Sequence, residues 1–270
     1  MKLRVAALFV YPVKSAAGVA LDAAEAGPAG LRHDRRWMIV DADGTFVTQR
    51  EMPALARIAV AVEAGGLRLD APGAGTLRVV EEPRAAARRQ VQVWGDVCAA
   101  VDAGPEAARW LSAFAGRPLA LVHLPDDALR TVDERYATGH RVGFADAYPY
   151  LLLGEASIAD LAARGGAPDP RRFRPNLVIA GAPPFAEDGW RVIETGGLRL
   201  ELVKPCARCA IPDVDPERGV RDPGTLAALA RYRTLEHRVL FGQNAVAAAT
   251  GTVRVGDEVR VLELQASALG

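Results

Sequence analysis

The residues best suited to chemistry are two cysteines, spaced as C-x-x-C in the segment KPCARC at residues 204–209. An apolar run at residues 198–203 predicts a strand directly before them, so we expect both thiols in a loop at a strand end. The spacing leaves four roles open: packed thiols, a dithiol redox pair, part of a zinc site, or one thiolate that binds a soft metal. Lys204 and Arg208 favour the thiolate, because positive charge lowers a thiol pKa. Pro212 interrupts the helix that a redox pair needs, and no second pair of cysteines supports zinc.

Basic side chains gather at the ends of three predicted strands. YPVKS (residues 11–15) ends the first strand and presents Lys14 and Ser15 in a turn, and HDRRW (residues 33–37) brings Arg35 to the start of the second. FRPN (residues 173–176) does the same for Arg174, which we expect to be extended because a proline follows it. Each cation alone is typical of a solvated surface. Together with Arg208 they would suit an anionic ligand, because arginine binds phosphate through a planar fork.

The composition limits the class of protein. The 270 residues hold 33 basic and 33 acidic residues and are 50% hydrophobic, which argues for a folded protein and against a nucleic-acid or membrane-surface partner. No apolar run reaches the length of a membrane span, and the N-terminal segment is too short for a signal peptide, so we expect neither. Three cysteines cannot form a disulfide framework, and the expected location is therefore cytoplasmic. Phosphate-loop, dinucleotide, serine-hydrolase and zinc-protease motifs are missing from the sequence.

Short strands dominate the predicted elements, and Gly or Pro punctuation recurs about every ten residues, which favours β-barrels over a parallel α/β sheet. Apolar runs of strand length, bounded by Gly and Pro turns, predict strands at residues 4–10, 36–40, 45–49, 58–63, 67–70, 90–94, 97–102, 176–181 and 198–203, and a closing hairpin over 251–264 that turns at Gly256-Asp257. Helical spacing predicts a helix at 155–164, and Pro and Gly at the helix ends predict two more, at 106–114 and 225–233. The fold class is therefore α+β and β-dominated, with two domains that divide near residue 124.

Taken in order, these motifs resemble a known family. YPVKS, RHDRRW, VTQRE, FRPN, KPCARC followed by DVDPERG, LFGQN and VRVGDEV are similar to the MOSC-domain proteins that carry an N-terminal MOSC β-barrel domain. The resemblance runs from about residue 4 to residue 262, and it is closest to the amidoxime-reducing components and their bacterial relatives. It implies an N-terminal β-rich domain over residues 1–124, whose first 35 residues contribute to the site, and a MOSC domain with short helices over 125–264.

The resemblance also implies a cofactor and the residues that hold it. The cofactor is molybdenum-molybdopterin, with molybdenum bound by Cys209. The family's other cofactor contacts fall here on Lys14, Ser15, Arg35, Asp146, Ala147, Arg174, Arg208 and Asn244. Ala147 and Ala207 stand where the family often has hydroxyl residues, which removes side-chain hydrogen bonds.

The implied activity is the reduction of small N-hydroxylated compounds, such as amidoximes, hydroxylamines and N-hydroxylated bases. Because the sequence has no dinucleotide motif and too few cysteines for an iron–sulfur centre, we expect electrons from a separate donor protein, a haem or iron–sulfur carrier with its reductase. Two alternatives stay open: a non-catalytic carrier of the molybdenum cofactor or of sulfur on Cys209, and a protein that binds pyridoxal phosphate through Lys14.

Overall fold

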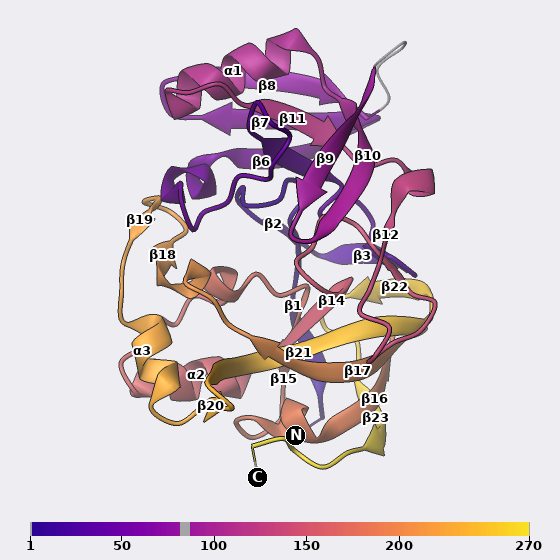
Figure 1. Cartoon of the computed structure of the whole chain (residues 1–270). Coiled ribbons are helices and arrows are strands. Elements are labelled where there is room, and N and C mark those ends of the chain that lie inside the picture. The colour runs from indigo at the N-terminus through magenta and orange to yellow at the C-terminus, as the bar shows by residue number, and fades with distance from the viewer. Residues whose placement is uncertain (1, 82–86, 270) are drawn as a thin grey trace.

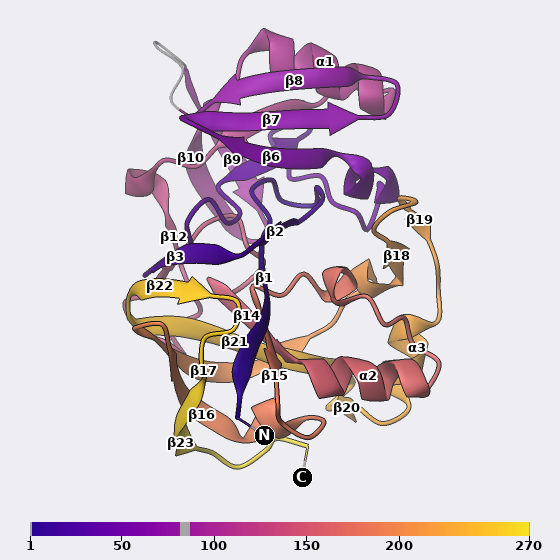
Figure 2. The same cartoon turned by 180° about the vertical axis from the view of Figure 1, so that it is seen from behind.

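The protein, described here from a computed structural model over residues 2–81 and 87–269, is built mainly of strands in two lobes (Figures 1 and 2). The predicted helices are present, as α1 (Pro105–Ala115), α2 (Glu155–Ala163) and α3 (Thr225–Ala230). Gly116 ends α1 with a φ of 69°, a left-handed conformation that glycine adopts without a Cβ clash. The β-dominated α+β class predicted from the sequence is confirmed.

One large sheet organises the lower lobe and holds the strands around which the predicted site residues lie. Its order is β2-β1-β15-β14-β21-β17-β16-β23, with β20 paired to β21, and its neighbours are antiparallel except for β14 and β15. Its strands are β1 (Arg4–Val10), β2 (Val19–Leu21), β14 (Tyr150–Gly154), β15 (Leu177–Ala180), β16 (Trp190–Thr195), β17 (Leu198–Ala207), β20 (Thr234–Leu235), β21 (Arg238–Ala249) and β23 (Arg260–Leu264). The first strand of the chain therefore lies between β2, which follows it closely in sequence, and β15, which is far from it and lies beside it in both views (Figures 1 and 2).

The upper lobe consists of two smaller antiparallel sheets against which α1 packs. One has the order β6-β7-β8 and the other β5-β11-β10-β9. Their strands are β5 (Trp37–Val40), β6 (Ala59–Glu63), β7 (Gly66–Ala71), β8 (Gly75–Val80), β9 (Arg88–Val93), β10 (Asp96–Asp102) and β11 (Ala120–His123). Residues 45–49, predicted as a strand, form only isolated bridges, at Phe46 with Val40 and at Thr45 with Gln92, although the turn before them is present.

The predicted closing hairpin is wrong. Its two halves are strands, β22 (Gly251–Arg254) and β23, but β22 pairs with β3 (Ala23–Gly27) and β23 pairs with β16. The turn at Gly256 is real, and it redirects the chain from one sheet to another instead of folding it back on itself. Further short pairs join β3 to β4 (Gly30–Leu31), β12 (Arg130–Thr131) to β13 (Arg141–Val142), and β18 (Val214–Asp215) to β19 (Val220–Arg221).

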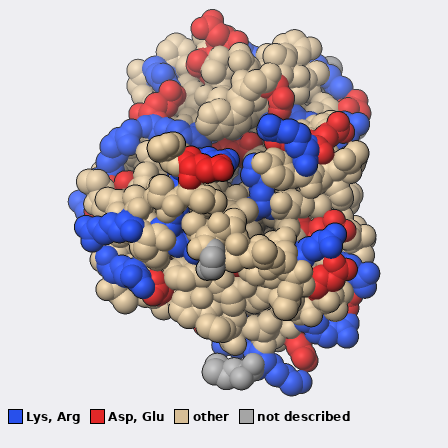
Figure 3. All heavy atoms as spheres, turned by 60° about the horizontal axis from the view of Figure 1, so that its bottom comes forward, with Lys and Arg blue, Asp and Glu red and all other residues tan. Residues whose placement is uncertain are grey.

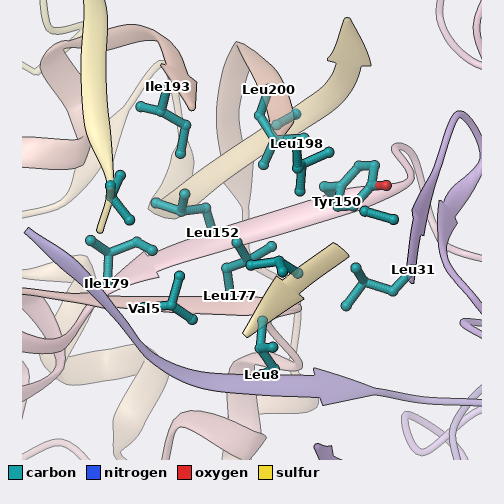
Figure 4. Close-up of a cluster of buried hydrophobic side chains, with 14 of the residues drawn as sticks. Val5, Leu8, Leu31, Tyr150, Leu152, Leu177, Ile179, Ile193, Leu198 and Leu200 are labelled. Atoms are coloured by element: carbon teal, nitrogen blue, oxygen red, sulfur yellow. The ribbon is translucent and has the colours of Figure 1, made fainter. Parts of the chain in front are cut away.

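The core of the large sheet explains why these strands assemble. Val5, Leu152, Leu177 and Leu200 come from four strands, are fully buried and point toward one another (Figure 4). Burying a side chain of this size stabilises a fold by about 1.5–3 kcal/mol. Because β1 and β15 share this core, residues 4–10 are held against residues 177–180.

The surface drawn in Figure 3 carries Lys and Arg separated by uncharged surface and by Asp and Glu. Within residues 2–81 and 87–269, no helix is long and apolar enough to cross a membrane. The cytoplasmic location stays a prediction, and so does the domain boundary at residue 124.

Candidate functional site

All nine residues that the resemblance assigned to the site line one pocket of about 220 Å³. They are Lys14, Ser15, Arg35, Asp146, Ala147, Arg174, Arg208, Cys209 and Asn244. They come from six separate parts of the chain, and sequence reasoning alone could not establish that those parts meet. The structure brings them together in one pocket.

The order of strands in the large sheet explains the convergence. β1 runs antiparallel to β15, and β14 runs parallel to β15, so the last residues of β1 lie at the same end of the sheet as the first residues of β14 and β15. Lys14 follows β1, Asp146 precedes β14 and Arg174 precedes β15, which places all three at that end of the sheet. On β21, Asn244 lies opposite Leu151 of β14 on one side and Lys204 of β17 on the other.

Three of the pocket residues have a left-handed backbone, which is uncommon for residues other than glycine. The φ angles are 70° at Ser15, 47° at Arg35 and 57° at Arg174. The extended conformation expected for Arg174 is therefore wrong. Pro175 disfavours the right-handed helical region, and the end of the 3-10 helix Pro170–Phe173 selects the left-handed one, with the Arg174 N–H donating to the Arg171 carbonyl at 3.2 Å. Such conformations are typical of sites where the surrounding structure fixes the backbone.

Arg35, which is buried, and Arg174, which is half-buried, both lie against Tyr11, with their guanidinium carbons 4.3 and 4.2 Å from the ring centroid. Arg35 donates to Asp34 at 2.6 Å and to the Arg174 carbonyl at 2.8 Å, whereas Arg174 donates to the Ala16 carbonyl at 2.7 Å. Within the described residues the buried Nη2 of Arg174 has no hydrogen-bond partner. Burial and the neighbouring Arg35 lower the pKa of Arg174 to about 10. Of the two arginines, only Arg35 is paired with a carboxylate within the described residues, and Arg174 keeps an unmet N–H donor.

Lys14 lies on the pocket wall with its side chain only 5% exposed. Its Nζ donates to the Phe144 carbonyl at 2.6 Å and to Asp146, whose other oxygen accepts from Arg50 Nη2 at 2.9 Å. Burial lowers the pKa of Lys14 to about 8, against the opposing attraction of Asp146. Burial alone would raise the pKa of Asp146, but Lys14 and Arg50 reverse this and hold the pKa well below its usual range.

The two cysteines differ in their surroundings. β17 continues to Ala207, beyond the end predicted at residue 203, so Cys206 lies in an irregular part of the strand and only Cys209 follows it. Arg208 donates to Cys206 Sγ at 3.0 Å and to the Phe173 carbonyl at 2.6 Å. Cys209 is half-buried and lies near Arg50: burial would lower the pKa of Arg50, but the charges of Asp146 and Cys209 raise it.

Arg50 is a charged pocket residue that sequence reasoning missed. Its guanidinium lies 4.6 Å from the Trp94 ring centroid and links Asp146 with Cys209. The one signal in the sequence was the segment VTQRE, which carried part of the family resemblance, because a single arginine after a turn is otherwise typical of a solvated surface.

The pocket as a whole is strongly positive. Its basic side chains outnumber its one carboxylate, Asp146. They are Lys14, Arg35, Arg50, Arg174, Lys204 and Arg208. Among residues 2–81 and 87–269, no three His, Cys, Asp or Glu side chains are placed to hold a metal ion. The arrangement can bind an anion beside two half-buried thiols, Cys206 and Cys209.

Comparisons with known proteins match this chain over nearly its whole length. The sequence pattern of the MOSC N-terminal beta barrel domain matches residues 2–118, and that of the MOSC domain matches residues 139–260. A Mus musculus protein named mitochondrial amidoxime-reducing component 1 is 34% identical over 278 residues, which cover 96% of this chain and 82% of the relative. Its Homo sapiens namesake is 33% identical over 280 residues, with the same coverage of 96% and 82%. A Danio rerio protein named molybdenum cofactor sulfurase is 31% identical over 259 residues, covering 87% of this chain but 31% of that protein.

Proposed function

The chain belongs to the MOSC family, as a MOSC N-terminal beta barrel domain followed by a MOSC domain, and on that premise we propose that it is a molybdenum-cofactor-dependent reductase of small N-hydroxylated compounds. The observation that carries the proposal is the pocket itself, in which six cationic side chains surround a half-buried thiol. The names of the amidoxime-reducing relatives, which are about a third identical over almost the whole chain, support the substrate class.

The pocket fits a phosphorylated, anionic cofactor. The buried Nη2 of Arg174 has no hydrogen-bond partner within the described residues, and a phosphate oxygen is the kind of acceptor that such a donor lacks. Arg35 holds the carbonyl of Arg174 and so sets its backbone, while Ser15 and Asn244 add uncharged polar groups to the wall. We therefore assign Arg35, Arg174 and Arg208 to the anionic part of the cofactor.

The pocket also fits a soft metal that brings sulfur ligands of its own. A thiolate is the protein ligand that such a metal prefers, and Cys209 lines the pocket near the Arg50 guanidinium. Because no three protein ligands converge within the described residues, a single thiolate is the contribution expected of this chain. We assign Cys209 to the metal and Cys206, which accepts from Arg208, to its support.

When bound, the cofactor would supply a redox-active metal that accepts an oxygen atom. The chain's own residues would bind the cofactor and the substrate and orient them. Reduction of an N–OH group to N–H releases water and consumes two electrons and two protons, so the pocket must also deliver protons. Lys14, with a pKa of about 8, holds a proton at Nζ near neutral pH and donates a hydrogen bond to Asp146 on the pocket wall. The electrons would come from a separate haem or iron–sulfur donor protein.

A carrier role is the second candidate, and one observation favours it. The relative named molybdenum cofactor sulfurase matches most of this chain with only 31% of its own length. In this role Cys209 would hold cofactor or sulfur without turnover. The pyridoxal-phosphate alternative stays a prediction. Its lysine, Lys14, is buried and engaged with Phe144 and Asp146.

The test is turnover of benzamidoxime by protein made in two hosts, one able and one unable to synthesise molybdopterin, each supplied with molybdate. With a chemical reductant, we expect benzamidine and water only from the first preparation, in proportion to its molybdenum content. Bound molybdenum without benzamidine would favour the carrier role. Equal turnover by both preparations would refute the proposal.

A further inference from the structure

A second cavity, of about 680 Å³, lies apart from the pocket described above. Its walls come from the turn between β3 and β4, from the end of β11, and from Glu81 directly after β8. It shares none of its lining residues with the cationic pocket. The residues of interest are His33, Glu81 and His123.

His123 is buried in the wall of this cavity with unused hydrogen-bonding capacity. Its side chain is 5% exposed, and within the described residues neither ring nitrogen has a hydrogen-bond partner. The ring packs on Trp37, with centroids 4.7 Å apart, which fixes its position. Burial and the nearby Arg36 lower the pKa of His123 to about 4, so the ring is neutral at pH 7 and offers one donor and one acceptor. Buried polar groups of this kind are normally satisfied by a ligand or water.

Glu81 is the carboxylate of this wall that no Lys or Arg pairs within residues 2–81 and 87–269. Its Oε1 lies 3.5 Å from His33 Nδ1 and 3.8 Å from His123 Nε2, and its side chain is 34% exposed. The other carboxylates of the wall are matched by arginines. Glu25 pairs with Arg32 at 2.9 Å, Asp126 with Arg36 at 2.7 Å, and Asp34 with Arg35 at 2.6 Å.

The charge of the second cavity is opposite to that of the first. Four carboxylates and two arginines line it, and His123 is neutral. A ligand must therefore bring positive charge for Glu81 and an N–H donor for the bare acceptor nitrogen of His123. A metal ion is the competing occupant, but no three His, Cys, Asp or Glu side chains in the described ranges are placed to hold one.

We propose that the second cavity binds a small organic cation with several N–H donors, of the amidinium or guanidinium class, between Glu81, His33 and His123. The planar N–H fork of such a cation matches a carboxylate, and a further N–H of the same group can reach the His123 ring. A simple ammonium offers no planar fork. The cationic pocket would repel the same ligand, which makes the two sites complementary in charge.

If the chain has the proposed function, the product of its reaction belongs to this ligand class. An N-hydroxylated amidine that takes up two electrons and two protons becomes an amidine and water, and the amidine is a strong base that is charged at neutral pH. The product would then fit the second cavity. Asp34 connects the two sites, because it lines the second cavity and its carboxylate accepts from Arg35 of the first.

Benzamidine is the probe, titrated calorimetrically into the purified full-length chain at pH 7.5 with no reductant or substrate. The Glu81→Gln variant keeps the shape of the side chain and removes its charge, and we expect it to weaken binding about tenfold, the loss of roughly one charge-assisted interaction. Glu25→Gln is the matched control, since that carboxylate lines the same cavity but is paired with Arg32. It should leave affinity unchanged.

A second measurement reports on the site itself. Benzamidine should shift the ring ¹⁵N resonances of His123 in the parent protein, and the shift should be lost in Glu81→Gln. Equal affinity of the parent and Glu81→Gln would overturn the proposal, and so would zinc that binds tightly and excludes benzamidine. Because no turnover is measured, binding by a chain that cannot reduce benzamidoxime would support this site while refuting the proposed function.

Discussion

Replacing Arg174 by methionine separates cofactor binding from folding. Methionine keeps much of the side-chain volume against Tyr11 but removes the charge and all N–H donors. We expect the cofactor-free variant to be about as stable as the parent and to lose its hold on the cofactor. The reason is that Arg174 is a half-buried cation beside a second one, Arg35, and has a donor left unmet.

The magnitude follows from the contacts. The variant lacks the 2.7 Å hydrogen bond from Arg174 to the Ala16 carbonyl, which stabilises the fold by about 1.5–3 kcal/mol. It also lacks the cation–π contact with Tyr11, which stabilises the fold by about 0.5–2 kcal/mol. It also removes a buried unpaired N–H group, which costs about 1–3 kcal/mol, and the repulsion from Arg35. These effects oppose one another, so the free energy of unfolding should change by about 1 kcal/mol or less. Loss of a charge-assisted bond to phosphate, about 1.5–3 kcal/mol, should weaken cofactor binding about 10- to 150-fold.

The assay combines urea unfolding of cofactor-free protein with the pterin content of protein purified from a molybdopterin-competent host. Arg171→Gln is the control, because Arg171 is paired with Asp169 and Glu217 outside the cationic pocket. It should keep the parental pterin content. The reasoning is refuted if Arg174→Met retains parental pterin, or if its cofactor-free form is as destabilised as a protein that has lost a core side chain.

Four further outcomes are expected. Cys206→Ser should keep its molybdenum and a measurable fraction of turnover, and a loss equal to that in Cys209→Ser would favour a redox pair or zinc. The isolated chain should not oxidise NADH with substrate, and sustained coupled oxidation would contradict a separate electron donor. Pterin release should accelerate as the pH rises through about 8, where Lys14 loses its charge, and Lys14→Arg should remove that inflection in a pH series. Arg233→Leu should cost about 3–5 kcal/mol in urea unfolding, because it strands the buried carboxylate of Asp188, 2.6 Å away; a cost below about 1 kcal/mol would contradict this.

Local signals predicted the elements well. The strand at residues 4–10 follows from an apolar run of strand length, and the helix around residues 106–114 follows from the Pro before it and the Gly after it, signals that act within a few residues. Pairing was harder. Gly256 marks a turn, but whether the flanking strands pair with each other depends on competing partners more than 60 residues away, and here β3 and β16 win.

The site was also predicted where local motifs identify it and missed where it depends on contacts between distant residues. The family resemblance identified Cys209 and its neighbours from short motifs, and the structure brings those motifs into one pocket. Arg50 was missed because its importance comes from Asp146 and Cys209, which are distant in sequence. The left-handed backbone of Arg174 was missed because the rule for residues before proline favours extended chain and does not register the end of a preceding 3-10 helix.

The most direct test of the central claim is X-ray absorption at the molybdenum edge, measured on the parent and on Cys209→Ser from the same molybdopterin-competent host. If Cys209 binds the metal, the parent should show one more sulfur neighbour than the variant, and benzamidoxime turnover should be lost with it. An identical number of sulfur neighbours in the two proteins, or a parent that carries no molybdenum, would contradict the account.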